Sequence, residues 1–190
     1  MKGDTTMQSI STFTPAASGS SGVMGQTSAS ITDDELISEI MDSVERFFFQ
    51  QAKIAIDNGA PYGGFIILTA GLHHAAGLPQ GDGLVNGNEF RDYCQTYLAD
   101  YDADALWGSL RCGFFHRGVP QPSNGVKSVV VTSKHPENHD PQGTQCINPG
   151  CITLDVEKFL VDLRKSIEKL LKKAASDPCL MAKCREAWGK

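Results

Sequence analysis

The sequence predicts a mainly α protein, a bundle of four to five helices with a small β-hairpin before the last long helix. Apolar residues recur at helical spacing through most of residues 32–175, whereas only 126–132 and 151–154 have the length and β-branched composition of strands. With 190 residues, 41% of them hydrophobic, the chain can build one domain with a core, predicted over 32–190. Residues 1–31 are rich in Ser, Thr and Gly and are predicted to be a disordered N-terminal tail.

The first predicted helix has a clear beginning and end. Thr32 is the expected N-cap, with Glu35 as its capping-box partner. An amphipathic pattern follows to Asn58, where Asn58-Gly59-Ala60-Pro61 ends the helix. The sequence therefore predicts a helix of about 26 residues that buries one face.

The second predicted helix, from Tyr62 to Leu78, is apolar nearly all round and is expected to lie at the centre of the bundle. It contains His73 and His74, which we expect at buried or rim positions, with a second catalytic histidine as the alternative. A Gly-rich loop over 79–87 lacks the Gly-Lys-Ser/Thr ending of a phosphate-binding loop. A third helix is predicted from about Asn88 to Asp100.

A helix over 103–118 carries the most informative motif of the chain. Asp102 or Asp104 is the expected N-cap, and Gly118-Val119-Pro120 ends the helix. One face is apolar and is expected to be buried: Ala103, Leu106, Trp107, Leu110 and Phe114. A second stripe is small and uncharged, so another helix could pack there from this chain or from a partner chain: Ala105, Ser109, Cys112 and His116.

Arg111 and His116, separated by four residues, are the candidate catalytic residues. The pair combines a permanent cation with the side chain best suited to move protons near neutral pH. The structural alternative is that Arg111 forms a surface ion pair or caps carbonyls, while His116 lies at the helix C-terminus, where a cation is favoured.

The Arg-x4-His motif in a helical bundle resembles the signature of the HEPN superfamily (higher eukaryote and prokaryote nucleotide-binding). The string Leu110-Arg111-Cys112-Gly113-Phe114-Phe115-His116, with Tyr62-Gly63-Gly64-Phe65 upstream, looks like a group of uncharacterised bacterial HEPN-like proteins. The resemblance covers about residues 35–175 and implies a HEPN-like helical domain.

The resemblance also implies a function. Catalytic HEPN proteins are homodimers that cleave RNA without metal or other cofactor, and many are toxins of toxin–antitoxin or abortive-infection systems. In this chain His116 would be the general acid/base and Arg111 the phosphate stabiliser, with an antitoxin or another protein as a further partner. The alternative is a non-catalytic HEPN module that binds a nucleotide or partner protein, which Cys112 and the net charge of −5 favour.

The loop between the two predicted strands suggests a third function, a zinc-stabilised interaction protein. It contains the possible zinc ligands His135, His139, Cys146 and Cys151. The cysteine spacing is at the loose end for such a site and the loop is rich in Pro, Asn and Gly, so unliganded loop residues are the expectation and no metal site is predicted.

Asp155 or Thr153 is expected to cap the last long helix, and Asp177 to begin a short terminal one. The long helix has an apolar stripe and a face of lysines that we expect to be solvated, or else to contact phosphate: Lys165, Lys169, Lys172 and Lys173. The sequence shows no signal peptide and no membrane-spanning stretch, so we expect a cytoplasmic protein with free thiols at its six cysteines.

Overall fold

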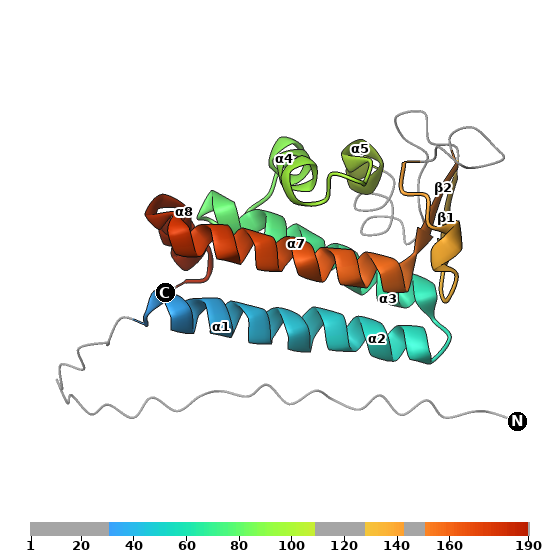
Figure 1. Ribbon diagram of the computed structural model, residues 1–190, viewed down its shortest axis with the longest axis horizontal. Helices are drawn as coiled ribbons and strands as arrows, with labels where there is room; N and C mark the ends of the chain where they lie inside the picture. Colours follow the sequence, from blue (N-terminus) through green and yellow to red (C-terminus); the bar gives the residue numbers. More distant parts are fainter. Residues whose placement is uncertain (1–30, 109–127, 143–150, 190) are drawn as a thin grey trace, which may run out of the picture.

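A continuous helical rod forms one side of the protein in the computed structural model, which describes residues 31–108, 128–142 and 151–189 (Figure 1). The rod comprises α1 (Asp33–Val44), a π-helical turn η1 (Glu45–Phe49) and α2 (Gln50–Asp57). Thr32 caps α1, and the Glu35 carboxylate accepts the Thr32 N–H at 2.8 Å, so the predicted capping box is confirmed.

Helix α3 (Pro61–Gly77) is the central helix, as predicted, and a short 3-10 turn η2 (Leu78–Gln80) follows it. The side chains of Phe65, Leu68 and Leu72 are completely buried. The Phe65 ring packs on Phe159 of the last long helix with 5.1 Å between ring centroids. An apolar sequence on all sides of a helix is explained by neighbours on several sides, here α2, α4 and α7.

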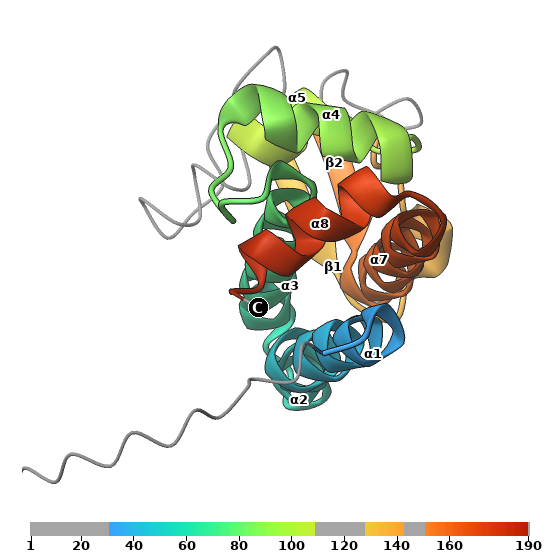
Figure 2. The ribbon, with the colours of Figure 1, turned by 90° about the vertical axis from the view of Figure 1, so that its left-hand side faces the viewer.

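Helix α7 (Val156–Ser176) runs beside the α1–α2 rod in the opposite direction, and α8 (Pro178–Ala187) crosses the end of the bundle (Figure 2). Asp155 caps α7 and Asp177 caps α8, which confirms both predicted helix starts. Arg185 of α8 donates to the Ile31 carbonyl at 2.8 Å and also pairs with Asp33. Ile31, predicted as the last residue of the tail, packs against the core.

A second layer consists of α4 (Gly87–Tyr97) and α5 (Ala103–Ala105), which lie on the opposite side of α7 from the rod (Figure 1). Asn86 caps α4 together with Glu89. The Tyr93 hydroxyl lies 3.0 Å from the Ser166 hydroxyl of α7, so a buried hydrogen bond joins the two helices.

The predicted β-hairpin is wrong, because β1 (Ser128–Thr132) and β2 (Cys151–Asp155) pair in parallel, with Val130 opposite Thr153. Strand length and composition predict strands but not their direction. Parallel strands need a crossover of about a dozen residues or more, and residues 133–150 are long enough to provide it. The crossover includes the 3-10 turn η4 (Pro136–Asn138), and Asp140 then forms an antiparallel bridge with Thr153 of β2.

The described residues therefore form a mainly α fold with a small two-stranded parallel sheet. With the rod counted once, this part of the chain has six α-helices, and the sixth, α8, is the short terminal helix that was predicted to begin at Asp177. None of the described helices is both long enough and apolar enough to cross a membrane.

Candidate functional site

The candidate catalytic residues Arg111 and His116, together with Cys112, lie outside the described residues. The structure describes the segment that leads into them, up to residue 108, and the strand β1 that follows. The structure therefore shows how the start of the motif helix is held in place.

The motif helix begins as predicted. Asp102 is the N-cap, and its Oδ1 accepts the Ala105 N–H at 2.9 Å. Asp104, the other expected cap, forms an ion pair with Arg91 of α4 instead. The helix continues through α5 into a π-helical stretch at 106–108. Its register up to residue 108 is thus set by a cap and by a charge pair to a neighbouring helix.

Packing against α4 fixes the orientation of this segment. Leu106 is 3% exposed, and the Trp107 ring packs on Phe90 with 5.2 Å between centroids. A Cβ atom at Gly87 would lie 3.0 Å from the Trp107 indole and 2.9 Å from the Arg91 guanidinium, so a larger residue there would have to displace both side chains. Ala105 is buried within this chain, so the small stripe of the motif helix begins at an intramolecular contact.

His74, one of the two histidines of α3, lies in an aromatic pocket of about 260 Å³ rather than beside other charged groups. Its ring is 5.8 Å from that of Phe48 and 5.5 Å from that of Trp188. Burial lowers the pKa of His74 below its usual value, so the ring is neutral at pH 7. This environment fits the structural role that the sequence predicts. His73 is half-buried on the same helix.

Of the four possible zinc ligands, the structure describes the side chains of two, His135 and His139. The His135 ring pairs with Glu137 at 3.1 Å, and the His139 Nδ1 accepts the Asp155 N–H at 3.0 Å. A neutral ring that accepts at Nδ1 carries its proton on Nε2, so neither nitrogen is free to bind a metal. Cys146 lies outside the described residues. Within 31–108, 128–142 and 151–189, no group of three or more His, Cys, Asp or Glu side chains could hold a metal ion.

The buried carboxylate of Asp155 does more than cap α7, and the sequence did not indicate this additional role. Its Oδ1 accepts the Lys158 N–H in α7, and its Oδ2 accepts the His135 N–H, each at 2.9 Å. The side chain is completely buried. Asp155 thus connects β2, the crossover loop and α7. A hydrogen bond between residues 20 positions apart leaves no periodic signal in a sequence.

Cys94 and Cys184 are free cysteines that are completely buried in the core. Burial raises the pKa of the Cys94 thiol to about 12 and that of Cys184 to about 11. Both are therefore protonated at neutral pH and are unsuited to nucleophilic catalysis.

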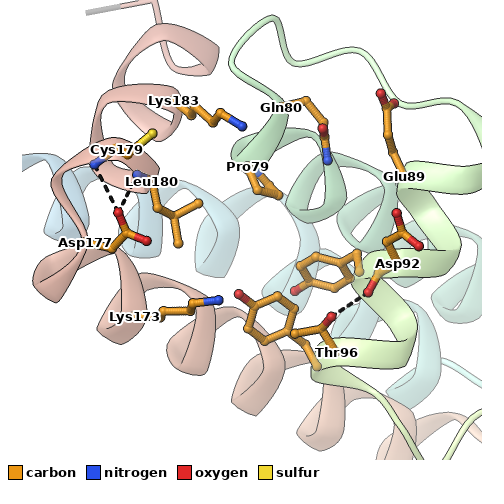
Figure 3. Close-up of a pocket in the computed structure, with 12 residues that line it drawn as sticks. Pro79, Gln80, Glu89, Asp92, Thr96, Lys173, Asp177, Cys179, Leu180 and Lys183 are labelled. Carbon is orange, nitrogen blue, oxygen red and sulfur yellow. Dashed lines mark hydrogen bonds between the residues drawn. The ribbon is translucent and has the colours of Figure 1, made fainter.

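A pocket with a volume of about 290 Å³, which no sequence feature indicated, lies between α4 and the junction of α7 and α8 (Figure 3). Lys173, one of the four lysines predicted to be solvated or to contact phosphate, lines it. Lys169 lies outside the pocket, where it donates to the Thr96 carbonyl at 3.3 Å and sits 5.7 Å from the centre of the Tyr97 ring. The pocket is assembled from residues far apart in the chain, so no local motif predicts it.

Comparison with known proteins provides no relative for this chain. No protein family model matches it, and neither a curated protein nor a solved structure does. The function of this protein is therefore inferred from the motif, from the residues that position it and from the surrounding chemistry.

Proposed function

We propose that this protein is a HEPN-type, metal-independent endoribonuclease, or an effector derived from such a nuclease, that acts as a homodimer in defence or toxin–antitoxin biology. The observation that carries the proposal is the sequence motif itself, Arg111 followed by His116 after four residues, in a predicted helix of which the structure describes only the start, at Ala103. The proposal also takes the site to be composite, so that each protomer contributes one Arg111 and one His116.

The chemistry of RNA cleavage accounts for these two residue types. Attack of the ribose 2′-hydroxyl on the adjacent phosphate requires a base, an acid for the leaving oxygen and a cation for the charged phosphorane. A histidine with a pKa near its usual value of about 6.5 can serve as base or acid at neutral pH. An arginine presents a planar set of donors that stabilises phosphoryl oxygens. His116 would therefore transfer protons and Arg111 would stabilise the transition state.

The described start of the motif helix supports this assignment. A catalytic pair must be held to within fractions of an ångström, and side chains on a packed helix are held better than those on a free loop. Asp102, Trp107 and the Arg91–Asp104 ion pair anchor the helix directly before the motif.

The test is cleavage of mixed RNA by the purified protein in the presence of EDTA, with Arg111→Ala, His116→Ala and His135→Ala variants measured beside the wild type. His135 is the matched control, because it is an exposed histidine whose ring forms an ion pair with Glu137 on the surface of the protein. We expect cleavage that persists in chelator, falls at least about 100-fold in the Arg111 and His116 variants, and is unchanged in the control. Equal cleavage by all four proteins would contradict the assignment, since it would indicate another site or a contaminating nuclease.

A second function, that of a non-catalytic HEPN module that binds a nucleotide or a partner protein, has its own supporting observations. Cys112 follows Arg111, and a thiol is a weak hydrogen-bond donor. The net charge of −5 also disfavours tight, nonspecific binding to RNA. Sedimentation of the same samples separates the two functions, because a folded homodimer that cleaves no RNA would support the binding module.

A further inference from the structure

The pocket between α4 and the α7–α8 junction has two lysines on one side and two carboxylates on the other, with a third carboxylate, that of Asp177, on the lysine side (Figure 3). Lys173 from the end of α7 and Lys183 from α8 reach toward it from one side, while Glu89 and Asp92 of α4 lie on the other. Within the described residues, neither lysine has a carboxylate oxygen within 4.0 Å. The walls are thus too far apart for their charges to pair directly.

The charged groups that line the pocket differ in how many hydrogen bonds they already form within the protein. The Glu89 carboxylate accepts the Asn86 N–H at 2.8 Å, and the Asp177 carboxylate caps α8. Asp92 contributes its backbone carbonyl to a hydrogen bond with Thr96, and no described donor bonds its carboxylate. Both ammonium groups and both oxygens of the Asp92 carboxylate therefore remain available to a molecule in the pocket, whereas Glu89 and Asp177 each have one carboxylate oxygen already bonded.

Between the charged walls the pocket is mainly apolar. Tyr93 and Tyr97 of α4 pack with 5.0 Å between ring centroids, and Pro79 and Leu180 complete this surface. The Tyr93 hydroxyl is already bonded to Ser166, so Tyr93 presents its ring to the pocket rather than a polar group. This surface suits an apolar side chain.

The rim of the pocket is held in place before any ligand binds. A Cβ atom at Gly77 would lie 2.7 Å from the Gly83 carbonyl oxygen, which shows how closely the chain after α3 folds back on it. Gly81, with φ of +94°, brings the same loop against Glu186 of α8. Pro79 and Gln80 are therefore fixed relative to α8, and binding need not order them.

We propose that this pocket binds a zwitterion of amino-acid size, an apolar or aromatic L-α-amino acid. Its carboxylate pairs with Lys173 and Lys183, its ammonium group pairs with Asp92, and its side chain packs on the two tyrosine rings. A phosphate or another anion would leave Asp92 and Glu89 facing negative charge, and a simple cation would face the two lysines. A ligand with both charges can pair with the lysines and with Asp92 at the same time. The proposal is independent of the proposed nuclease activity.

The test is titration of the ¹⁵N-labelled full chain with the apolar and aromatic L-amino acids, followed by NMR and by thermal melting. We expect at least one of them to bind with a Kd of about 1 mM or tighter, with shifts in the amide signals of Asp92, Thr96 and Lys183. At about 100 times the Kd, the melting temperature should rise by roughly 5 °C.

Blocked ligands test the need for both charges. The N-acetyl derivative of the bound amino acid keeps the carboxylate alone, its amide keeps the ammonium group alone, and inorganic phosphate supplies an anion alone. We expect each to bind at least about tenfold more weakly than the zwitterion. Equal or tighter binding of phosphate, or of either blocked derivative, would overturn the proposal.

Variants locate the binding to this pocket. Asp92→Asn and Lys183→Gln should each weaken binding of the amino acid about tenfold or more. Lys172→Gln is the matched control, because Lys172 is an exposed lysine of α7 that does not line the pocket, and it should leave the Kd unchanged. Both pocket residues are on the surface of folded helices, so the fold should survive these changes, which the unliganded NMR spectrum checks. Binding that is unaffected by both pocket variants, or no binding by any amino acid at about 10 mM, would also overturn the proposal.

Discussion

Substituting Asp155 with alanine is the most informative perturbation of the fold. The carboxylate is completely buried and accepts two backbone N–H groups, from Lys158 in the first turn of α7 and from His135 in the crossover loop, each at 2.9 Å. Alanine removes both acceptors and leaves the two donors without their partner. The helix cap and the attachment of the loop are therefore lost together.

The expected cost follows from these two bonds. A hydrogen bond to a charged group contributes about 1.5–3 kcal/mol, and loss of an N-cap alone costs about 1 kcal/mol. We expect Asp155→Ala to lower the free energy of unfolding by about 3 kcal/mol. For a chain of this size, that corresponds to a fall in melting temperature of roughly 6–12 °C.

Urea unfolding, followed by circular dichroism, measures this change, and two further variants separate its parts. Asp155→Asn keeps one acceptor for the cap but places an amide nitrogen where the second oxygen was, so it should lose about half as much stability. Asp177→Ala removes the cap of α8, where the carboxylate is only half-buried and bonds only within its own helix among the described residues, and should cost about 1 kcal/mol. If Asp155→Ala were no more destabilising than Asp177→Ala, the role of Asp155 in joining the loop to α7 would be refuted.

Three other predictions follow from the described contacts. Stability should fall as the pH is lowered from about 7 to 5, because burial lowers the pKa of His74 and His139 in the folded state below the unfolded value of about 6.5, so the unfolded chain binds more protons. Urea unfolding of His74→Phe should show a shallower fall of stability with pH. An unchanged pH slope would contradict this cause. Gly77→Ala should destabilise the protein by about 1–3 kcal/mol, because its Cβ would meet the Gly83 carbonyl at 2.7 Å. Gly63→Ala in the same helix should stabilise the protein by up to about 1 kcal/mol, since the nearest neighbours of its Cβ lie at 3.7 and 3.8 Å. Thermal melts that ranked the two variants in the reverse order would exclude this explanation. EDTA should leave the melting temperature unchanged, because the described residues hold no cluster of metal ligands, and a clear fall would indicate a structural metal.

The helices could be predicted because their signals are local. Thr32 with Glu35, Asp102, Asp155 and Asp177 all cap the helices for which they were candidates, since capping depends on residues within one turn of each other. The π-helical turn at Glu45–Phe49 was not predicted. This turn disturbs the spacing of the apolar residues only slightly, so the sequence pattern remains compatible with one straight helix.

The remaining features depend on contacts between distant residues. The direction of the strand pair depends on the path of the crossover, so the alternation of residues in each strand carries no information about it. The pocket, likewise, combines α4 with residues some 80 positions later. For Arg111 and His116 the sequence predicts the residue types and their spacing, and their positions lie outside the described residues.

The hydrogen bonds between α8 and the start of α1 have a consequence for synthesis of the protein in the cell. Asp33 and its partner Arg185 are 152 residues apart, so at about 5–20 residues per second the ribosome needs roughly 8–30 s to produce the second after the first. The contacts of Arg185 with Ile31 and Asp33, and of Trp188 with Glu39, form only after that interval. Until then the apolar face of the first helix lacks its α7 and α8 neighbours, and we expect nascent chains to depend on chaperones during this period.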